Sequence, residues 1–188
     1  DGARLAEVTG ELALADVRLR LAPELPLLDL ISLSGRVSAE QLSQERVVAS
    51  ARQLQLATRD GLRVQPTSID LRWQAAAGNE VERGELSASA LDLDALTRLS
   101  AYLPLPDPVR DRLQRHAAQG VVHELDGGWT GPLSAPTAFR VSARLDRVGL
   151  RADGALPGVS GLSGRIEGSD VRGSVQIDAP ELVLDLPA

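Results

Sequence analysis

The stretch TSIDLRWQA, residues 67–75, alternates between polar and apolar side chains. Ile69, Leu71 and Trp73 fall on one side of an extended chain, whereas Asp70 and Arg72 fall on the other. Side chains of a β-strand point to opposite faces with a period of two, so the stretch predicts a strand with one apolar and one polar face. The pattern leaves open whether the apolar face meets a protein core, a partner or an apolar molecule.

The same alternation recurs along most of the chain. Gly, Pro, Asn and Asp separate the alternating runs, as turns between antiparallel strands require. Strands and helices do not alternate along the sequence as they do in chains that form a parallel sheet. The chain is therefore predicted to be mainly β, with about ten strands in all. The predicted strands include residues 13–22, 31–39, 47–58, 81–93, 121–131, 138–152 and three short segments of the tail.

One segment, at about 92–119, shows helical spacing instead, with leucines three and four residues apart. Asp92 is placed to cap a first helix, and Pro104 is placed to stop it. Asp107 is placed to cap a second helix, and Gly120 lies just past its predicted end. The segment is predicted to be a hairpin of two short helices inserted between strands.

Composition limits the classes of function. The 188 residues suffice for a single β-rich unit with a core, and the absence of Met indicates a segment of a larger protein. The net charge of −6 argues against non-specific nucleic-acid binding, which needs a basic surface. The absence of Cys excludes disulfides and thiolate sites. No run of ~18 apolar residues predicts a membrane-spanning helix within this chain.

The apolar residues are mostly aliphatic. They make up 43% of the chain, but aromatic residues make up only 2%. Aromatic side chains bury the largest areas and dominate the energetics of compact cores. Apolar strand faces made of Leu, Val and Ala suit a surface that is covered loosely or by a flexible molecule.

The sequence contains no catalytic pattern. His116 and His123 have no partners at metal-ligand spacing. The stretch GVSGLSG, residues 158–164, has Gly directly after each Ser, unlike the sharp turn that exposes a nucleophilic serine. All 20 basic residues are Arg, so a phosphate-binding loop with Lys is absent. We expect no enzymatic activity, no cofactor and no catalytic or metal-binding residue, which leaves a binding or structural role.

Three stretches resemble, in the same order, the YhdP proteins of the AsmA-like superfamily, which are related to TamB and YdbH. They are IDLRWQAAAGNEVERGELSASALDLDALTRLSAYLPLP (69–106), QGVVHELDGGWTG (119–131) and FRVSARLDRVGLRADGALPGVSGLSGRIEGSDVRGSVQIDAPELVLDLP (139–187). Together they cover roughly 69–187, and residues 1–68 resemble the family less closely. No single motif is diagnostic, and the order of the three stretches is what carries the resemblance.

The resemblance implies an elongated, curved, open antiparallel sheet with an apolar groove. It further implies a periplasmic protein of Gram-negative bacteria, anchored in the inner membrane by a segment outside this chain. Its partners would be phospholipid acyl chains and other envelope proteins, with no nucleic acid and no cofactor. On this hypothesis the groove candidates are Ile69, Leu71, Phe139, Val141, Leu145, Ile166 and Ile177.

An alternative follows from the strand pattern alone, because a half-apolar strand is usually half buried in protein. The chain would then be a structural or protein-binding β-sandwich module of an envelope protein, with a closed core. On the groove hypothesis, Leu71 is expected to form part of the wall. Trp73 is expected near the edge of the sheet or against the helical hairpin, because its large ring and N–H suit a wet rim.

Overall fold

A computed structural model describes residues 6–43, 45–105, 107–153 and 157–185. Most of these residues lie in strands, which confirms the prediction of a mainly β chain with one helical insertion. The elements in chain order are β1 (Ala6–Leu19), β2 (Leu28–Ser43), β3 (Arg46–Thr58), β4 (Arg63–Gln74), β5 (Arg83–Asp92), α1 (Leu93–Leu99), α2 (Asp107–His116), β6 (Gln119–Thr130), β7 (Ala138–Leu150), β8 (Gly158–Ser169), β9 (Gly173–Ile177) and β10 (Val183–Asp185).

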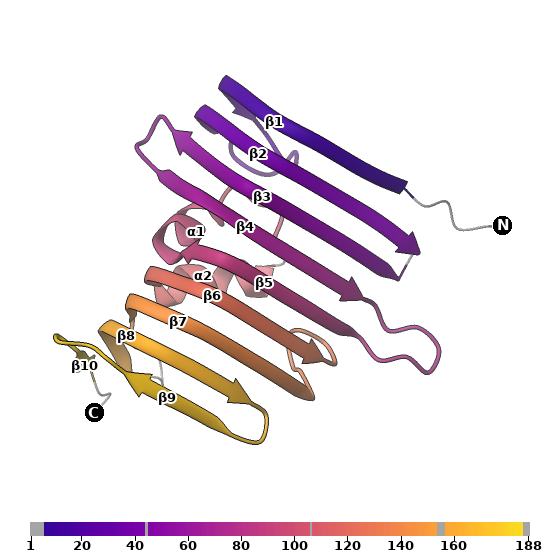
Figure 1. Ribbon diagram of the computed structural model, residues 1–188. Helices are drawn as coiled ribbons and strands as arrows, with labels where there is room; N and C mark the ends of the chain where they lie inside the picture. The colour runs from indigo at the N-terminus through magenta and orange to yellow at the C-terminus, as the bar shows by residue number, and fades with distance from the viewer. Residues whose placement is uncertain (1–5, 44, 106, 154–156, 186–188) are drawn as a thin grey trace.

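The ten strands form one antiparallel sheet (Figure 1). Strands β1 to β8 follow one another in chain order, and both β9 and β10 pair with the far side of β8. The sheet does not close on itself, since β1 lies at one edge and β9 and β10 lie at the other. The described residues contain no second sheet packed on the first, so the sandwich alternative is wrong and the open sheet is confirmed.

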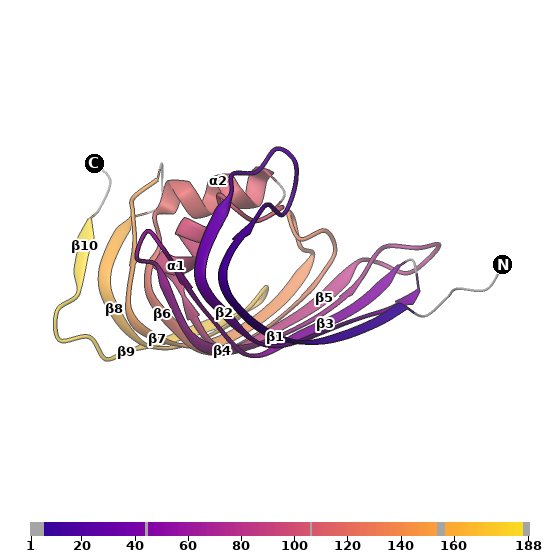
Figure 2. The same ribbon diagram turned by 90° about the horizontal axis from the view of Figure 1, so that it is seen from above.

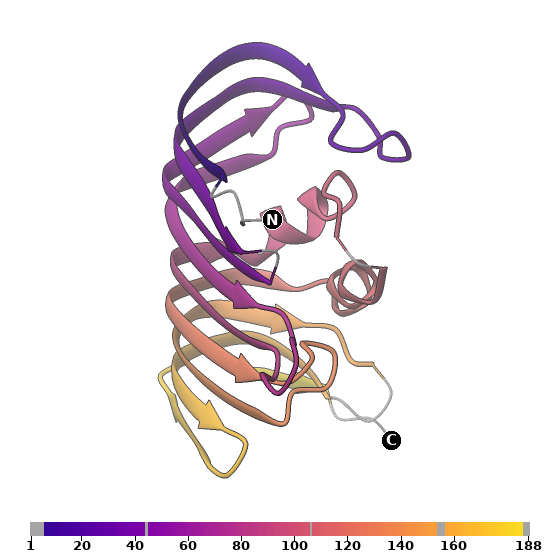
Figure 3. The ribbon, with the colours of Figure 1, turned by 90° about the vertical axis from the view of Figure 1, so that its right-hand side faces the viewer.

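The sheet is strongly curved along its strands (Figures 2 and 3). Four strands contain a residue other than glycine with a positive φ angle: Asp16 in β1, Gln53 in β3, Glu124 in β6 and Arg147 in β7. The pairing register shifts at the last three of these positions, Gln53, Glu124 and Arg147. Such β-bulges place an extra residue on one strand and bend it. The bulges therefore supply the curvature that gives the sheet a concave and a convex face.

The two helices lie on the concave side (Figures 2 and 3). Asp92 caps α1 as predicted, because its side chain accepts a hydrogen bond of 2.9 Å from the backbone N–H of Ala95. The helix ends at Leu99, earlier than the predicted stop at Pro104. There the hydroxyl of Ser100 donates to the carbonyl of Thr97, and the chain turns.

The predicted end of the second helix is wrong. Helix α2 ends at His116, where Ala117 adopts a left-handed conformation with φ 41°. Gly120 instead belongs to β6, with φ 90°. A Cβ atom at Gly120 would lie 2.5 Å from the carbonyl oxygen of Arg147. The glycine is thus required by close contact between two strands rather than by a helix terminus.

Most of the buried apolar residues lie toward one end of the strands, which we call the helix end. It comprises the β1–β2, β3–β4, β5–β6 and β7–β8 connections, and the other end is called the open end. Ala143, Leu145 and Val148 of β7 form a cluster against which Leu93 of α1 packs. A second group, at the β1–β2 and β3–β4 connections, contains Leu25, Leu28, Leu30 and Leu62, each at most 6% exposed.

Candidate functional site

Side chains on the concave face form rows that cross the sheet, because antiparallel partners in register point to the same face. Leu71 of β4 pairs with Ala49 of β3 and with Leu86 of β5. The row through these residues, here called the Leu71 row, contains only apolar residues and glycine. Its members from β1 to β8 are Val8, Ala39, Ala49, Leu71, Leu86, Gly127, Val141 and Gly168.

A parallel row passes through Ile69, two residues nearer the helix end. It is also free of polar side chains, and its members from β1 to β6 are Gly10, Val37, Ala51, Ile69, Ala88 and Leu125. Beyond the register shift between β6 and β7, the pairing of Ala143, Ile166 and Val175 continues it. Neighbouring strands lie about 4.8 Å apart, so a row across eight strands is about 34 Å long.

The rows are only partly covered by protein. Leu71, Leu86 and Val141 are half-buried, and Val8 at the β1 edge is 66% exposed. Val175 at the opposite edge is 61% exposed. Large apolar side chains in a closed core would be buried, as Leu145 is under α1 with 8% exposed. The concave face is therefore an apolar groove that remains open away from the helices.

The helices form one wall of this groove. The hydroxyl of Thr97 in α1 donates to the carbonyl of Ala118 at 3.4 Å, which ties the helix to the start of β6. The guanidinium of Arg98 contacts the carboxylate of Asp60 in the β3–β4 turn at 3.0 Å. The hydrogen bond from Thr58 and the contact with Arg98 lower the pKa of Asp60. These contacts hold α1 between two connections at the helix end.

Aromatic residues lie toward the open end of the groove. One row on the concave face contains Trp73, Gly84, Trp129 and Phe139 in register. A Cβ atom at Gly84 would lie 2.1 Å from the ring of Trp129, so only glycine leaves room for this ring. The indole N–H of Trp73 donates to Glu82 at 3.4 Å. Trp73 thus lies near the rim, which was one of its two predicted positions. It lies away from the helical hairpin, which was the other.

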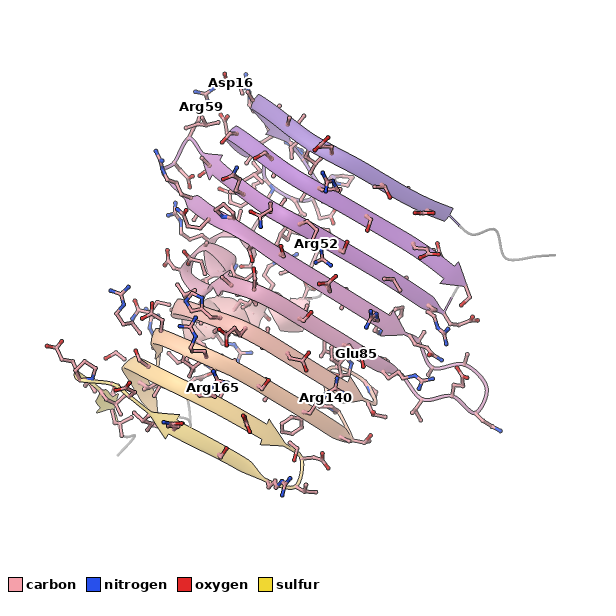
Figure 4. The ribbon with its side chains drawn as sticks, in the orientation of Figure 1. Asp16, Arg52, Arg59, Glu85, Arg140 and Arg165 are labelled. Carbon is pink, nitrogen blue, oxygen red and sulfur yellow. The ribbon has the colours of Figure 1, made fainter. Side chains whose placement is uncertain are left out.

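The convex face is polar and charged (Figure 4). Arg52 of β3 donates two hydrogen bonds, of 2.6 and 2.7 Å, to the carboxylate of Asp70 in β4. This paired arginine lowers the pKa of Asp70, and the carboxylate in turn raises the pKa of Arg52. Further on, Glu124 of β6 lies within 3.5 Å of Arg144 and 3.6 Å of Arg165. Exposed pairs each contribute little to stability, but together they keep this face in water.

A family model described as YhdP protein matches residues 1–188. The chain belongs to the YhdP family. No match was found among the curated proteins or among the solved structures. Membership in the YhdP family suggests an AsmA-like protein of the cell envelope. Neither of the two described helices has the length and apolar character needed to span a bilayer.

In this YhdP-family chain, all seven groove candidates lie on the concave face, but in different surroundings. Ile69, Leu71 and Val141 lie on the groove floor, and Phe139 lies at the rim, 41% exposed. Leu145 is buried under α1, with 8% exposed. The other two candidates lie nearer the far edge, where Ile166 packs beside the buried cluster and Ile177 of β9 is 53% exposed.

Sequence reasoning missed several members of the YhdP-family groove. Leu86 lies beside Leu71, and Val8, Ala49 and Gly127 extend the same row. The alternation of residues 81–93 could have indicated Leu86. The alanines and glycines gave no such signal, because small residues carry little hydrophobic pattern of their own.

The described part of the YhdP-family chain shows no arrangement typical of catalysis. It contains no group of three or more His, Asp or Glu side chains that could hold a metal ion. The carboxylates with a lowered pKa, Asp60 and Asp70, are both exposed partners of arginine. Their pKa shifts arise from ion pairs and hydrogen bonds, so they do not indicate acid–base chemistry.

Proposed function

We propose that this segment provides an apolar groove for phospholipid acyl chains that move between the inner and outer membranes. The observation that supports the proposal is the Leu71 row, an apolar and partly exposed row across eight strands of an open sheet. In this proposal the segment lies in the periplasm and is anchored to the inner membrane through a part of the protein outside residues 1–188. We assign it no enzymatic activity and no nucleic-acid partner.

The energetics favour such a surface. Exposing an acyl chain to water costs about 0.8 kcal/mol per CH₂ group, or about 12 kcal/mol for a chain of ~16 carbons. Each leaflet contributes about 15 Å of the ~30 Å hydrocarbon core of a bilayer, which indicates the depth that an acyl chain occupies. The Leu71 row, at about 34 Å, is longer than this. An acyl chain lying along the row would stay in contact with apolar side chains over its length.

The groove floor also suits movement better than storage. The Leu71 row contains no side chain that could fix a ligand by a hydrogen bond. Gly127 and Gly168 leave its β6 and β8 positions without side chains, so no residue there projects across the path. Contact with such a surface lowers the cost of exposing an acyl chain without creating a deep free-energy minimum at any one position.

Photo-crosslinking tests the proposal directly. A photoreactive residue at position 86, introduced into the full-length protein in cells, is expected to capture phospholipid. Leu71→Asp, on the adjacent strand, should reduce this capture by about tenfold or more, since a carboxylate buried against hydrocarbon costs several kcal/mol. Val48→Asp is the matched control, because Val48 lies on the convex face opposite Arg72 and undergoes the same chemical change.

Two outcomes would contradict the groove. One is undiminished lipid capture in the Leu71→Asp protein, which would show that acyl chains do not contact this row. The other is an equal loss in the Leu71→Asp and Val48→Asp proteins at equal expression and equal folding by circular dichroism, which would show that lipid capture does not depend on the concave face.

A further inference from the structure

A hollow of about 630 Å³, here called the aromatic hollow, lies on the concave face at the open end of the sheet and extends from β3 to β7. Its lining is mainly apolar and is centred on one in-register row of residues. They are Val47, Trp73, Gly84, Trp129 and Phe139. Three of the four aromatic residues of the chain thus line a single cavity, whose volume is within the range of about 300–1,000 Å³ that is typical of ligand sites.

The aromatic hollow is continuous with the apolar groove. Trp73 lies two residues beyond Leu71 in β4, and Phe139 lies two residues from Val141 in β7, so the two rows are neighbours on the same face. Trp73 is half-buried and Phe139 is 41% exposed, which leaves part of each ring accessible. A molecule that lies in the groove can therefore place one end in the aromatic hollow.

One carboxylate lies at the rim of the aromatic hollow. Oε1 of Glu82 accepts hydrogen bonds of 3.4 Å from the indole N–H of Trp73 and of 3.3 Å from the backbone N–H of Leu133. These two bonds hold the half-buried side chain beside the tryptophan ring. In the part of the chain that the structure describes, no arginine forms an ion pair with Glu82, and its Oε2 accepts no hydrogen bond. The negative charge therefore remains available to a cation.

The arginines near the aromatic hollow belong to the opposite face of the sheet. Four of them alternate with the aromatic row along their strands, so their side chains point to the convex face. They are Arg46, Arg72, Arg83 and Arg140. The sheet separates these guanidinium groups from a ligand in the hollow, whereas Glu82 lies on the same side as Trp73.

We infer that the aromatic hollow binds the ammonium group of a phospholipid headgroup, and this inference rests on the proposed function, since the acyl chains of the same lipid lie in the groove. An ammonium group is attracted to the faces of aromatic rings, and most strongly to those of Trp. A primary ammonium also donates charge-assisted hydrogen bonds, for which Oε2 of Glu82 is an acceptor. A glycerol headgroup has neutral hydroxyl groups in place of this charge. The aromatic hollow therefore favours ethanolamine over glycerol headgroups.

Binding of two short-chain lipids to the 188-residue chain tests the inference. Dihexanoylphosphatidylethanolamine and dihexanoylphosphatidylglycerol have the same acyl chains and phosphate, so a difference in affinity reports on the headgroup. The only two tryptophans of the chain both line the hollow, and their emission measures binding below the micellar concentration. At about 0.5 M NaCl, which largely screens the net charge of the chain, we expect the ethanolamine lipid to bind about fivefold more tightly.

Matched variants localise this preference. Glu82→Gln keeps an acceptor for Trp73 but removes the charge, and Phe139→Leu removes a ring but stays apolar. Each should reduce the preference to about twofold or less. Glu167→Gln is the control, because it removes the same charge from the convex face, where Glu167 of β8 is paired with Ser142. The preference should stay at about fivefold in this protein.

Several results would overturn the inference and leave the proposed function intact. They are equal affinity for the two lipids, tighter binding of the glycerol lipid, an unchanged preference in both Glu82→Gln and Phe139→Leu, or an equal loss of preference in Glu167→Gln. Leu71→Asp should weaken the binding of both lipids alike, because it changes the groove and not the hollow. Failure of both lipids to bind the unmodified chain would contradict the proposed function and the inference together.

Discussion

Two leucines of the concave face should respond very differently to the same truncation. Leu145 is 8% exposed and packs in the cluster under α1, so Leu145→Ala removes buried atoms and leaves a cavity. Such substitutions cost about 2–5 kcal/mol, and we expect roughly 3 kcal/mol here. Leu71 is half-buried and faces the open groove, where no closed cavity can form. For Leu71→Ala we expect a loss of about 1 kcal/mol.

Urea denaturation followed by circular dichroism measures the difference. With a slope of about 2.5 kcal/mol/M, the losses correspond to shifts in the midpoint of about 1.2 M for Leu145→Ala and 0.4 M for Leu71→Ala. The slope itself should be unchanged in both variants. Equal shifts near 1 M would show that Leu71 is enclosed like Leu145, and the open groove would then be wrong.

Three further predictions concern the residues that shape and support the groove. Gly84→Ala should destabilise the chain by about 2 kcal/mol and alter near-UV circular dichroism, because the new Cβ displaces the ring of Trp129; unchanged spectra would contradict this contact. Asp92→Ala should cost about 1 kcal/mol in thermal or urea unfolding through loss of the helix cap, whereas Asp92→Asn should retain most of it. Because Arg52 lowers the pKa of folded Asp70, the pair stabilises the fold above the unfolded pKa of about 3.9, and this contribution disappears as pH falls through the folded pKa. The melting temperatures of the wild type and Arg52→Gln should therefore differ slightly at neutral pH and converge in acid, and a difference that grows in acid would refute the sign.

The strands and their faces could be predicted from alternation alone. Residues 67–75 indicated which side of β4 is apolar, and the pairing of Ile69 and Leu71 with apolar partners bears this out. The openness of the sheet could not be predicted in this way, because alternation is the same for a sheet that faces a second sheet and one that faces a groove. That prediction came from the family resemblance.

The curvature of the sheet could not be predicted from the sequence, for a physical reason. The bulges at Gln53, Glu124 and Arg147 place residues other than glycine at positive φ. Such residues rarely adopt this conformation, so their identity does not predict it. Gly120 led to a wrong prediction of the end of the second helix, because a glycine after a helical pattern usually follows the last helical residue. In the structure it admits the backbone of Arg147 instead. Contacts between strands distant in sequence decide both features.

The placement of large and small residues makes the two sides of the groove different, one toward the helix end and one toward the open end. Its central row has alanine or glycine at four of its positions, which are Ala39, Ala49, Gly127 and Gly168. Three of the four aromatic residues of the chain lie instead in the row near the open rim. Indole rings suit a boundary between apolar and polar surroundings. Under the proposed function, acyl chains would therefore lie along the Leu71 row and the row through Ile69. Headgroups would lie toward the open rim, because the helix end is occupied by α1 and its buried cluster.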